Sequence, residues 1–488
     1  MSDSPRQGRR VERLVRLVVT GLMTVMLSLA AALPELPADL RRLAGLAASL
    51  PPEFQADALL QIVESRGGLD PALKKNLLEQ ASTIARQARN PYPKVIARGT
   101  NADSRQAFAG SALGLKLDRL SLETRAIRVM LAFDPTSARV MFQQQLQKPA
   151  IPNGTCSDAL IPQLDDYYDV AAQVAARGFT PKELNRQEHV AMLLQILAGL
   201  RAPYEVGDAA RMVSSVNLPS QQFEAVLNAF TARLETIAPD DRSFTETGLA
   251  TQQEISALAS RVTSAGISRT ALARAYRKYL TANYSKARCA DSPGARIAGN
   301  PTISPVDWFN QSDLRGDLPA IEMKEISVKD PGGKIQVDGY WSTPDSEKIL
   351  EAARSLRNSP GGVLYSSQDR LSSEWNQKLQ EFLEQVSQWK QSGDESELDF
   401  FNQKALVYES LIDVCPTGEA RQRMIYAFVD FLKSSNALAQ TPVDWFWHVQ
   451  NMYRRLRQAG DDDATKLMTA YKGSGNLMLE VYAQLNGR

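Results

Sequence analysis

The stretch from residue 53 to residue 89, EFQADALLQIVESRGGLDPALKKNLLEQASTIARQAR, decides the fold class. Apolar residues recur at helical spacing on both sides of a Gly-Gly-Leu-Asp-Pro break at residues 67–71. Within the break one glycine supplies a left-handed stop, Asp70 caps the second helix, and Pro71 takes its first position, where no N–H donor is needed. The stretch therefore predicts a helical hairpin.

A hairpin of two amphipathic helices leaves an apolar stripe exposed on each helix, so further helices must cover it. Similar stripes recur along most of the chain, with varying lengths and no fixed period. We therefore expect an all-α fold, an irregular and α-solenoid-like stack of antiparallel helical hairpins.

Local signals predict where individual helices begin. Thr180-x-x-Glu183 and Thr251-x-x-Glu254 both have the pattern of a capping box, in which side chains satisfy free N–H groups at a helix start. The first box predicts one helix over residues 181–200, and the second predicts a helix start near residue 251.

The domain organisation follows from changes in composition. We expect a signal peptide over residues 1–32, an N-terminal helical domain over 33–289, a Pro/Gly-rich connector over 290–342 and a C-terminal helical domain over 343–488. Within the connector, apolar residues alternate from Ile321 to Val337 around a Pro-Gly-Gly turn, which is typical of a small β-hairpin.

The N-terminus has the three parts of a secretory signal peptide. Five arginines face two acids in the first sixteen residues, a local charge of +3, and an uncharged segment over residues 17–32 follows, with an Ala30-x-Ala32 exit. Export to the periplasm or the exterior is the expectation. An uncleaved membrane anchor and a buried helix are the alternatives, because the apolar segment is almost long enough to span a bilayer.

The rest of the chain is almost neutral. The whole chain has a net charge of +1 and its first sixteen residues have +3, so the remainder has a net charge of −2. Proteins that bind nucleic acid need a clustered positive surface. Nucleic acid is therefore not an expected partner.

Three cysteines are present. In an oxidising compartment Cys156 and Cys289, which both lie in loop-like sequence, are the candidates for a disulfide. Cys415 lies next to the apolar Leu411, Ile412 and Val414, which favours a buried free thiol.

The pentapeptide Pro-Val-Asp-Trp-Phe occurs twice, at residues 305–309 and 442–446. One interpretation is a duplicated docking element, with Trp308, Trp445 and Trp447 as partner contacts. The other is that both copies are helix starts, with proline at the first position and aromatic residues for packing.

Catalytic signatures are few. The only histidines, His189 and His448, lie on apolar helical stripes, where a hydrogen-bonded imidazole is usual. The sequence has no zinc-binding motif, phosphate loop or nucleophile elbow, so we expect no metal and no cofactor.

One pair of carboxylates supports an enzyme hypothesis. Asp165 and Asp169 lie one helical turn apart, beside two tyrosines. Glycan-cleaving enzymes use such paired carboxylates, so a hydrolase or lyase of all-helical fold is the enzymatic alternative. The structural alternative is a helix start, where acids interact favourably with the helix dipole.

Several segments, among them Phe54–Ile62, Gly178–Glu183, Tyr340–Pro344 and Asp444–His448, resemble a family of exported, helix-rich bacterial proteins of uncharacterised function. The resemblance implies export and a helical fold, and it carries no activity or site residue. The leading functional hypothesis is a non-catalytic scaffold that offers a surface to a protein or peptide partner in the cell envelope.

Overall fold

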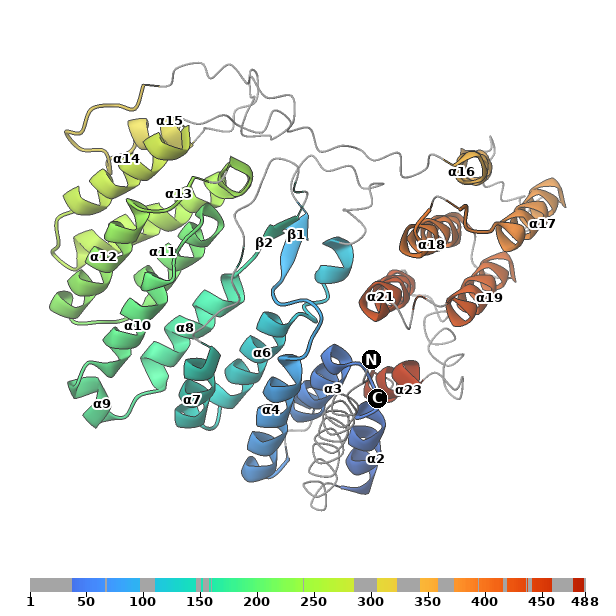
Figure 1. Ribbon diagram of the computed structural model, residues 1–488, viewed down its shortest axis with the longest axis horizontal. Coiled ribbons are helices and arrows are strands. Elements are labelled where there is room, and N and C mark those ends of the chain that lie inside the picture. Colours follow the sequence, from blue (N-terminus) through green and yellow to red (C-terminus); the bar gives the residue numbers. More distant parts are fainter. Residues whose placement is uncertain are drawn as a thin grey trace, which may run out of the picture.

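The protein is all-α in its computed structural model, as predicted, apart from one small sheet (Figure 1). The structure describes residues 37–65, 68–96, 110–145, 151, 158, 160–239, 241–284, 305–322, 343–358, 373–393, 395–415, 419–435, 437, 441–458 and 477–486.

The first long series of helices runs from α2 to α15. Its elements are α2 (Ala38–Ala47), α3 (Pro52–Ser65), α4 (Pro71–Ala85), α6 (Arg119–Leu131), α7 (Pro135–Gln145), α8 (Asp165–Arg177), α9 (Pro181–Asn185), α10 (Glu188–Ala198), the 3-10 helix η1 (Pro203–Glu205), α11 (Val206–Ser215), α12 (Ser220–Leu234), α13 (Asp241–Ser264), α14 (Thr270–Tyr284) and α15 (Pro305–Gln311). The second series contains α16 (Pro344–Asn358), α17 (Ser373–Gln388), α18 (Glu397–Val414), α19 (Glu419–Ser434), α21 (Pro442–Gln458) and α23 (Leu477–Asn486).

The predicted hairpin is formed by α3 and α4. The Asp70 carboxylate accepts hydrogen bonds from the N–H groups of Ala72 and Leu73, and Pro71 begins α4. Gly68 does not have a positive φ, and Gly67 lies outside the described residues, so no left-handed stop is found at Gly68.

Successive helices extend this hairpin into an arc. Helix α4 packs on α6, α6 on α7 and α8, α8 on α11, and α11 on α13, while α10, α12 and α14 form neighbouring contacts (Figure 1). The apolar stripes meet in one continuous core. The stack is irregular because the helices differ in length, as expected.

The sheet lies inside the first series of helices and not in the connector. Strand β1 (Lys94–Ile96) pairs antiparallel with β2 (Leu160–Pro162), with Val95 opposite Ile161. Residues 323–342, which hold most of the expected connector hairpin, lie outside the described residues. The helical segment that begins at Gly110 packs against this sheet. The approach is so close that a Cβ at Gly110 would lie 2.6 Å from the Ile96 side chain.

The helix expected over residues 181–200 is broken in two. The Thr180 capping box forms as predicted and begins α9, but Gln187 takes a left-handed conformation with φ of 59° and separates α9 from α10. The second predicted capping box is wrong. Helix α13 runs through Thr251 without interruption, so Glu254 lies within the helix and its carboxylate is available for other contacts.

The last helix of the chain packs against the first ones. Helix α23 contacts both α2 and α3 (Figure 1). The Phe446 ring of α21 lies 4.3 Å from the Tyr482 ring of α23 and 5.1 Å from the Phe54 ring of α3, measured between centroids. The second series of helices is thereby joined to the beginning of the first.

Within the described part of the chain, none of the helices combines the length and the apolar character needed to cross a bilayer. The expected signal peptide at residues 1–32 lies outside that part.

Candidate functional site

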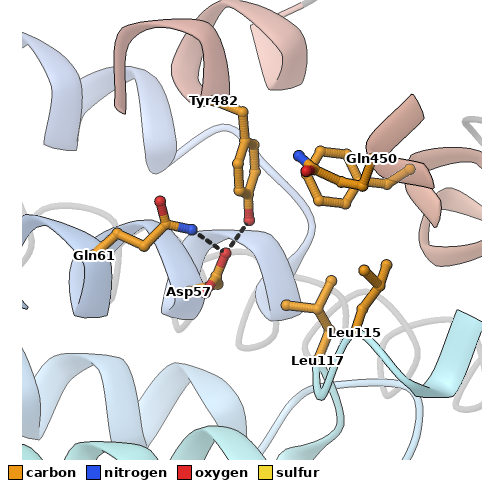
Figure 2. A pocket seen from close by; sticks show the side chains of 7 residues that line it. Asp57, Gln61, Leu115, Leu117, Gln450 and Tyr482 are labelled. Carbon is orange, nitrogen blue, oxygen red and sulfur yellow. Dashed lines mark hydrogen bonds between the residues drawn. The ribbon is translucent and has the colours of Figure 1, made fainter. Parts of the chain in front are cut away.

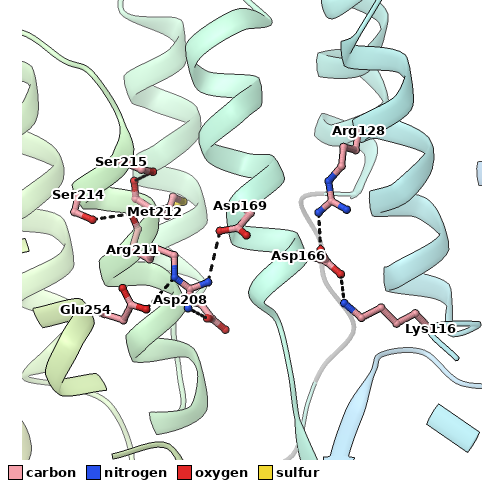
Figure 3. A network of polar contacts seen from close by, with 10 residues as sticks. All are labelled: Lys116, Arg128, Asp166, Asp169, Asp208, Arg211, Met212, Ser214, Ser215 and Glu254. Atoms are coloured by element: carbon pink, nitrogen blue, oxygen red, sulfur yellow. Dashed lines mark hydrogen bonds and ion pairs between the residues drawn. The ribbon is translucent and has the colours of Figure 1, made fainter. Parts of the chain in front are cut away.

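The predicted carboxylates Asp165 and Asp169 both lie in the first half of α8. The Asp169 carboxylate faces the Arg211 guanidinium of α11, with Oδ1 and Nη1 3.7 Å apart (Figure 3). Asp166, between them in sequence, instead pairs with Arg128 and Lys116, each at 2.5 Å. Helix α8 therefore presents acids toward three basic partners, Arg211 for Asp169 and Arg128 and Lys116 for Asp166.

Arg211 also binds two further carboxylates. Its Nη2 lies 3.0 Å from Asp208 on the same helix, and its Nε lies 3.0 Å from Glu254 on α13. Figure 3 shows these groups converging on the one guanidinium. We call Asp169, Asp208, Arg211 and Glu254 the Arg211 cluster.

Asp208 and Asp169 have raised pKa values. Burial raises the pKa of Asp208 to about 7, an effect that Arg211 opposes and the neighbouring Asp165 and Asp169 reinforce. Burial also raises the pKa of Asp169. A carboxyl group that changes its charge near neutral pH is suited to proton transfer.

The sequence pattern identified only part of this cluster. Asp208 and Arg211 are three residues apart on α11. Ion pairs with this spacing are common on helices, so the spacing does not indicate a functional site. The Thr251-x-x-Glu254 pattern predicts Glu254 at a helix cap, because it places the helix start at residue 251. The three helices come together only through the packing of α11 on α8 and α13.

A second candidate site lies where the ends of the described chain meet. A pocket of about 180 Å³, the junction pocket, is lined by Asp57, Gln61, Leu115, Leu117, Phe446, Gln450 and Tyr482 (Figure 2). The Asp57 carboxylate is buried and accepts hydrogen bonds from Tyr482, from Gln61 at 2.7 Å and from Arg125 at 2.5 Å.

A third candidate is a larger depression between α4 and α7. This α4–α7 groove measures about 440 Å³ and is lined by Lys75, Glu79, Ser82, Thr83, Arg86, Ser137, Val140, Met141 and Gln144. Val140 is 45% exposed although it is apolar. The groove therefore combines hydrogen-bonding side chains with an accessible apolar one.

Both histidines are buried. His448 lies between Glu409, 2.7 Å from Nδ1, and the Asn402 side-chain oxygen, 2.9 Å from Nε2. Burial lowers the pKa of His189, whose ring packs against Phe179. Both side chains belong to the core, as expected for imidazoles on apolar stripes.

The three tryptophans named as partner contacts differ in position. Trp445 is fully buried, and its indole N–H donates to the Leu432 carbonyl at 3.0 Å, so it stabilises the helix packing. Trp308 and Trp447 are partly buried beside the core. Both copies of the repeated pentapeptide begin helices, α15 and α21, at their proline.

Cys415 is buried and free, and burial raises the pKa of its thiol to about 12. It therefore stays protonated and unreactive at neutral pH. Cys156 and Cys289 lie outside the described residues, so their predicted pairing stays a prediction.

Among the residues that the structure describes, no group of three or more His, Cys, Asp or Glu side chains is arranged to hold a metal ion. No protein-family model matches the chain, and neither a curated protein nor a solved structure matches it.

Proposed function

We propose that this chain is an exported, non-catalytic binding protein that holds an extended peptide segment of a protein partner in the cell envelope. The observation that carries the proposal is the α4–α7 groove, the larger of the two pockets described above. Export rests on the charge and apolar pattern of residues 1–32.

The length of the groove suits a short peptide. Lys75 and Arg86 lie near opposite ends of α4, about 16 Å apart at the usual rise of about 1.5 Å per residue. An extended chain rises about 3.3 Å per residue, so roughly five peptide residues fit between these two side chains.

Both end residues keep hydrogen-bond donors for a ligand. The Lys75 ammonium has three donors and uses two, on Asp134 and Ser137. The Arg86 guanidinium has five and bonds through Nε to Glu123 and through Nη2 to Gln144. Their side chains are 41% and 40% exposed, which leaves the remaining donors accessible to peptide carbonyls or carboxylates.

Selection from a random peptide library displayed on phage tests the proposal directly. The purified chain without residues 1–32 is expected to enrich sequences with a common core of about five residues. Val140→Glu is expected to weaken their binding about tenfold, because it removes an apolar contact and places a charge in the groove.

Leu184→Glu is the matched control, since Leu184 is an exposed apolar residue outside the groove. Peptides that bind this control as well as they bind the parent chain, but not Val140→Glu, support the proposal. Failure to enrich any sequence, or equal binding to all three proteins, contradicts it.

The Arg211 cluster favours a second candidate function, a carboxylate-dependent glycan hydrolase or lyase. Asp208 has the raised pKa that a general acid needs, and Asp169 shares its arginine. In this hypothesis Asp208 donates a proton to the leaving oxygen, and Asp169 or Asp165 is the second carboxylate.

An activity screen on cell-envelope polysaccharides separates the two candidates. Turnover by the parent chain that is lost in Asp208→Asn and in Asp169→Asn supports the enzyme and contradicts the non-catalytic proposal. The outcome expected from our proposal is that no polysaccharide is cleaved.

A further inference from the structure

The junction pocket combines chemical features that the proposed peptide groove does not have. Its walls come from four separate parts of the chain: α3, the segment before α6, α21 and α23 (Figure 2). Phe446 and Tyr482 are only 3% and 2% exposed, so tight packing holds the aromatic wall in place.

The charges around the pocket leave no free positive group. Asp57 is the only acidic or basic side chain in the lining apart from the phenol of Tyr482, and the Arg125 guanidinium, 2.5 Å from Asp57, also binds Glu64 at 2.8 Å. Burial, with the nearby Asp57 carboxylate, raises the pKa of Tyr482 well above its ordinary value, so the phenol stays protonated. An anionic ligand would find no free positive group to pair with and would lose its hydration.

The pocket nevertheless offers several hydrogen-bonding groups. The amide of Gln450 makes no hydrogen bond to any other residue of the described ranges, so its carbonyl and both N–H donors are free for a ligand. Gln61 uses one N–H on Asp57 and keeps its carbonyl oxygen. Leu115, Leu117 and Phe446 add apolar surface.

The size of the pocket limits the ligand. A volume of about 180 Å³ is less than a drug-sized ligand needs, so only a small ligand of about one sugar ring fits. A small, uncharged ligand that carries several hydroxyl groups and presents an apolar face to the leucines and the phenyl ring fits these walls.

From this combination we infer that the junction pocket binds a single neutral pyranose sugar, either as a free monosaccharide or as the end of a glycan chain. The ring hydroxyls bond to Gln61, Gln450 and the free lone pairs of Asp57, and the C–H face packs against Phe446 and Leu117. This site is separate from the α4–α7 groove and does not depend on peptide binding.

Sugar binding also strengthens the junction. The pocket exists only while α23 and α21 stay in contact with α3, so the ligand binds the joined arrangement and stabilises it. Bound sugar is therefore expected to slow hydrogen exchange in α21 and α23 while leaving exchange in α12 unchanged.

The probes are D-glucose, D-galactose, D-mannose and their methyl pyranosides, with glucuronate as the anionic comparison. Saturation-transfer NMR on the chain without residues 1–32 is expected to show binding of at least one neutral sugar, with a dissociation constant on the order of millimolar. A methyl glycoside that binds better than its free sugar indicates a glycan end, and the reverse indicates a free monosaccharide.

Gln450→Leu is the decisive variant because Gln450 has no role in the described hydrogen-bond network. It is expected to weaken binding about fivefold to tenfold, the effect of losing one or two ligand hydrogen bonds. Gln380→Leu, on an exposed part of α17, is the matched control and is expected to bind like the parent chain.

Three results would overturn the inference: no neutral sugar binds at about ten millimolar, Gln450→Leu binds as well as the parent, or glucuronate binds as tightly as the neutral sugars. None of these results bears on the peptide groove, whose test uses different variants.

Discussion

Tyr482 connects the last helix of the chain to the first hairpin through one hydroxyl group. Its OH donates to Asp57, which also accepts from Arg125 and Gln61, and all of these side chains meet between α3, α6 and α23. A hydrogen bond to a buried charged acceptor contributes more to the free energy of unfolding than a hydrogen bond between neutral groups. We therefore expect this contact to stabilise the packing of α23 on α3.

Tyr482→Phe is expected to lower the free energy of unfolding by about 1.5 to 3 kcal/mol, because the ring stays but the donor to a buried carboxylate is lost. Urea denaturation followed by circular dichroism measures the change. Tyr426→Phe is the control, since Tyr426 is 53% exposed, and is expected to stay within about 0.5 kcal/mol of the parent. Equal stability of both variants would show that the Tyr482 hydroxyl does not hold α23.

Asp208 makes stability depend on pH. Its pKa is raised in the folded protein to about 7, so between roughly pH 4 and pH 7 the folded state binds more protons than the unfolded state. The contribution of Asp208 to the free energy of unfolding is therefore greatest at low pH and is lost as the pH rises toward 7.

Asp208→Asn has no proton to lose and removes this dependence. As the pH rises from 4 to 7, the free energy of unfolding of the variant minus that of the parent is expected to increase by about 1 to 3 kcal/mol. Urea denaturation at a series of pH values measures this difference. Asp317→Asn, at an exposed position, is expected to give a curve parallel to that of the parent. Parallel curves for both variants would contradict the raised pKa.

At the scale of the helix, the break between α9 and α10 is the feature that periodicity could not predict. The apolar pattern continues across residues 181–200, yet Gln187 adopts a left-handed conformation and starts a new helix. Left-handed geometry is unfavourable for residues with a Cβ and neutral for glycine.

Gln187→Gly is expected to raise the free energy of unfolding by about 0.5 to 1 kcal/mol, since it relieves this backbone strain. Arg186→Gly is the matched control, because Arg186 has a φ of −84° and gains nothing from glycine. Thermal unfolding of the two variants is the measurement. A loss of stability in Gln187→Gly equal to that in Arg186→Gly would show that residue 187 is not strained.

Helix α13 is continuous at a position where the sequence pattern predicts a helix start. The Thr251-x-x-Glu254 pattern is that of a helix start, but the helix begins ten residues earlier, at Asp241. A capping box forms only where the chain has free N–H groups, and packing of α13 along α11 extends the helix through the motif. Glu254 is thereby placed beside Arg211 and not at a cap.

At the scale of the whole molecule, the contact of α23 with α2 and α3 joins the two ends of the described chain. Removal of residues 477–488 is expected to uncover the apolar side chains of α2 and α3, including Phe54, and to remove one wall of the junction pocket. Helix α2 packs on α23 as extensively as on α3, so it is expected to lose part of its protection from hydrogen exchange.

Hydrogen exchange with mass spectrometry measures this effect, and α12 and α14 are the internal reference because they lie far along the arc (Figure 1). Faster exchange in α2 and α3 with unchanged exchange in α12 supports a closing role for α23. Unchanged exchange throughout would show that the first hairpin is stable without the last helix.

The sequence alone determined the fold class, the first hairpin and the caps at Asp70 and Thr180, because helical periodicity and capping act over a few neighbouring residues. It also predicted Asp165 and Asp169 on one helix. It did not predict the small sheet, the break at Gln187 or the continuation of α13.

The candidate sites were decided by the tertiary structure. The Arg211 cluster needs three helices, and the junction pocket brings Asp57 together with Tyr482, 425 residues later in the chain. Such pairs have no fixed spacing in sequence. They form because every helix must bury its apolar stripe on whichever neighbour fits it, and the polar residues at those contacts are brought together as a consequence.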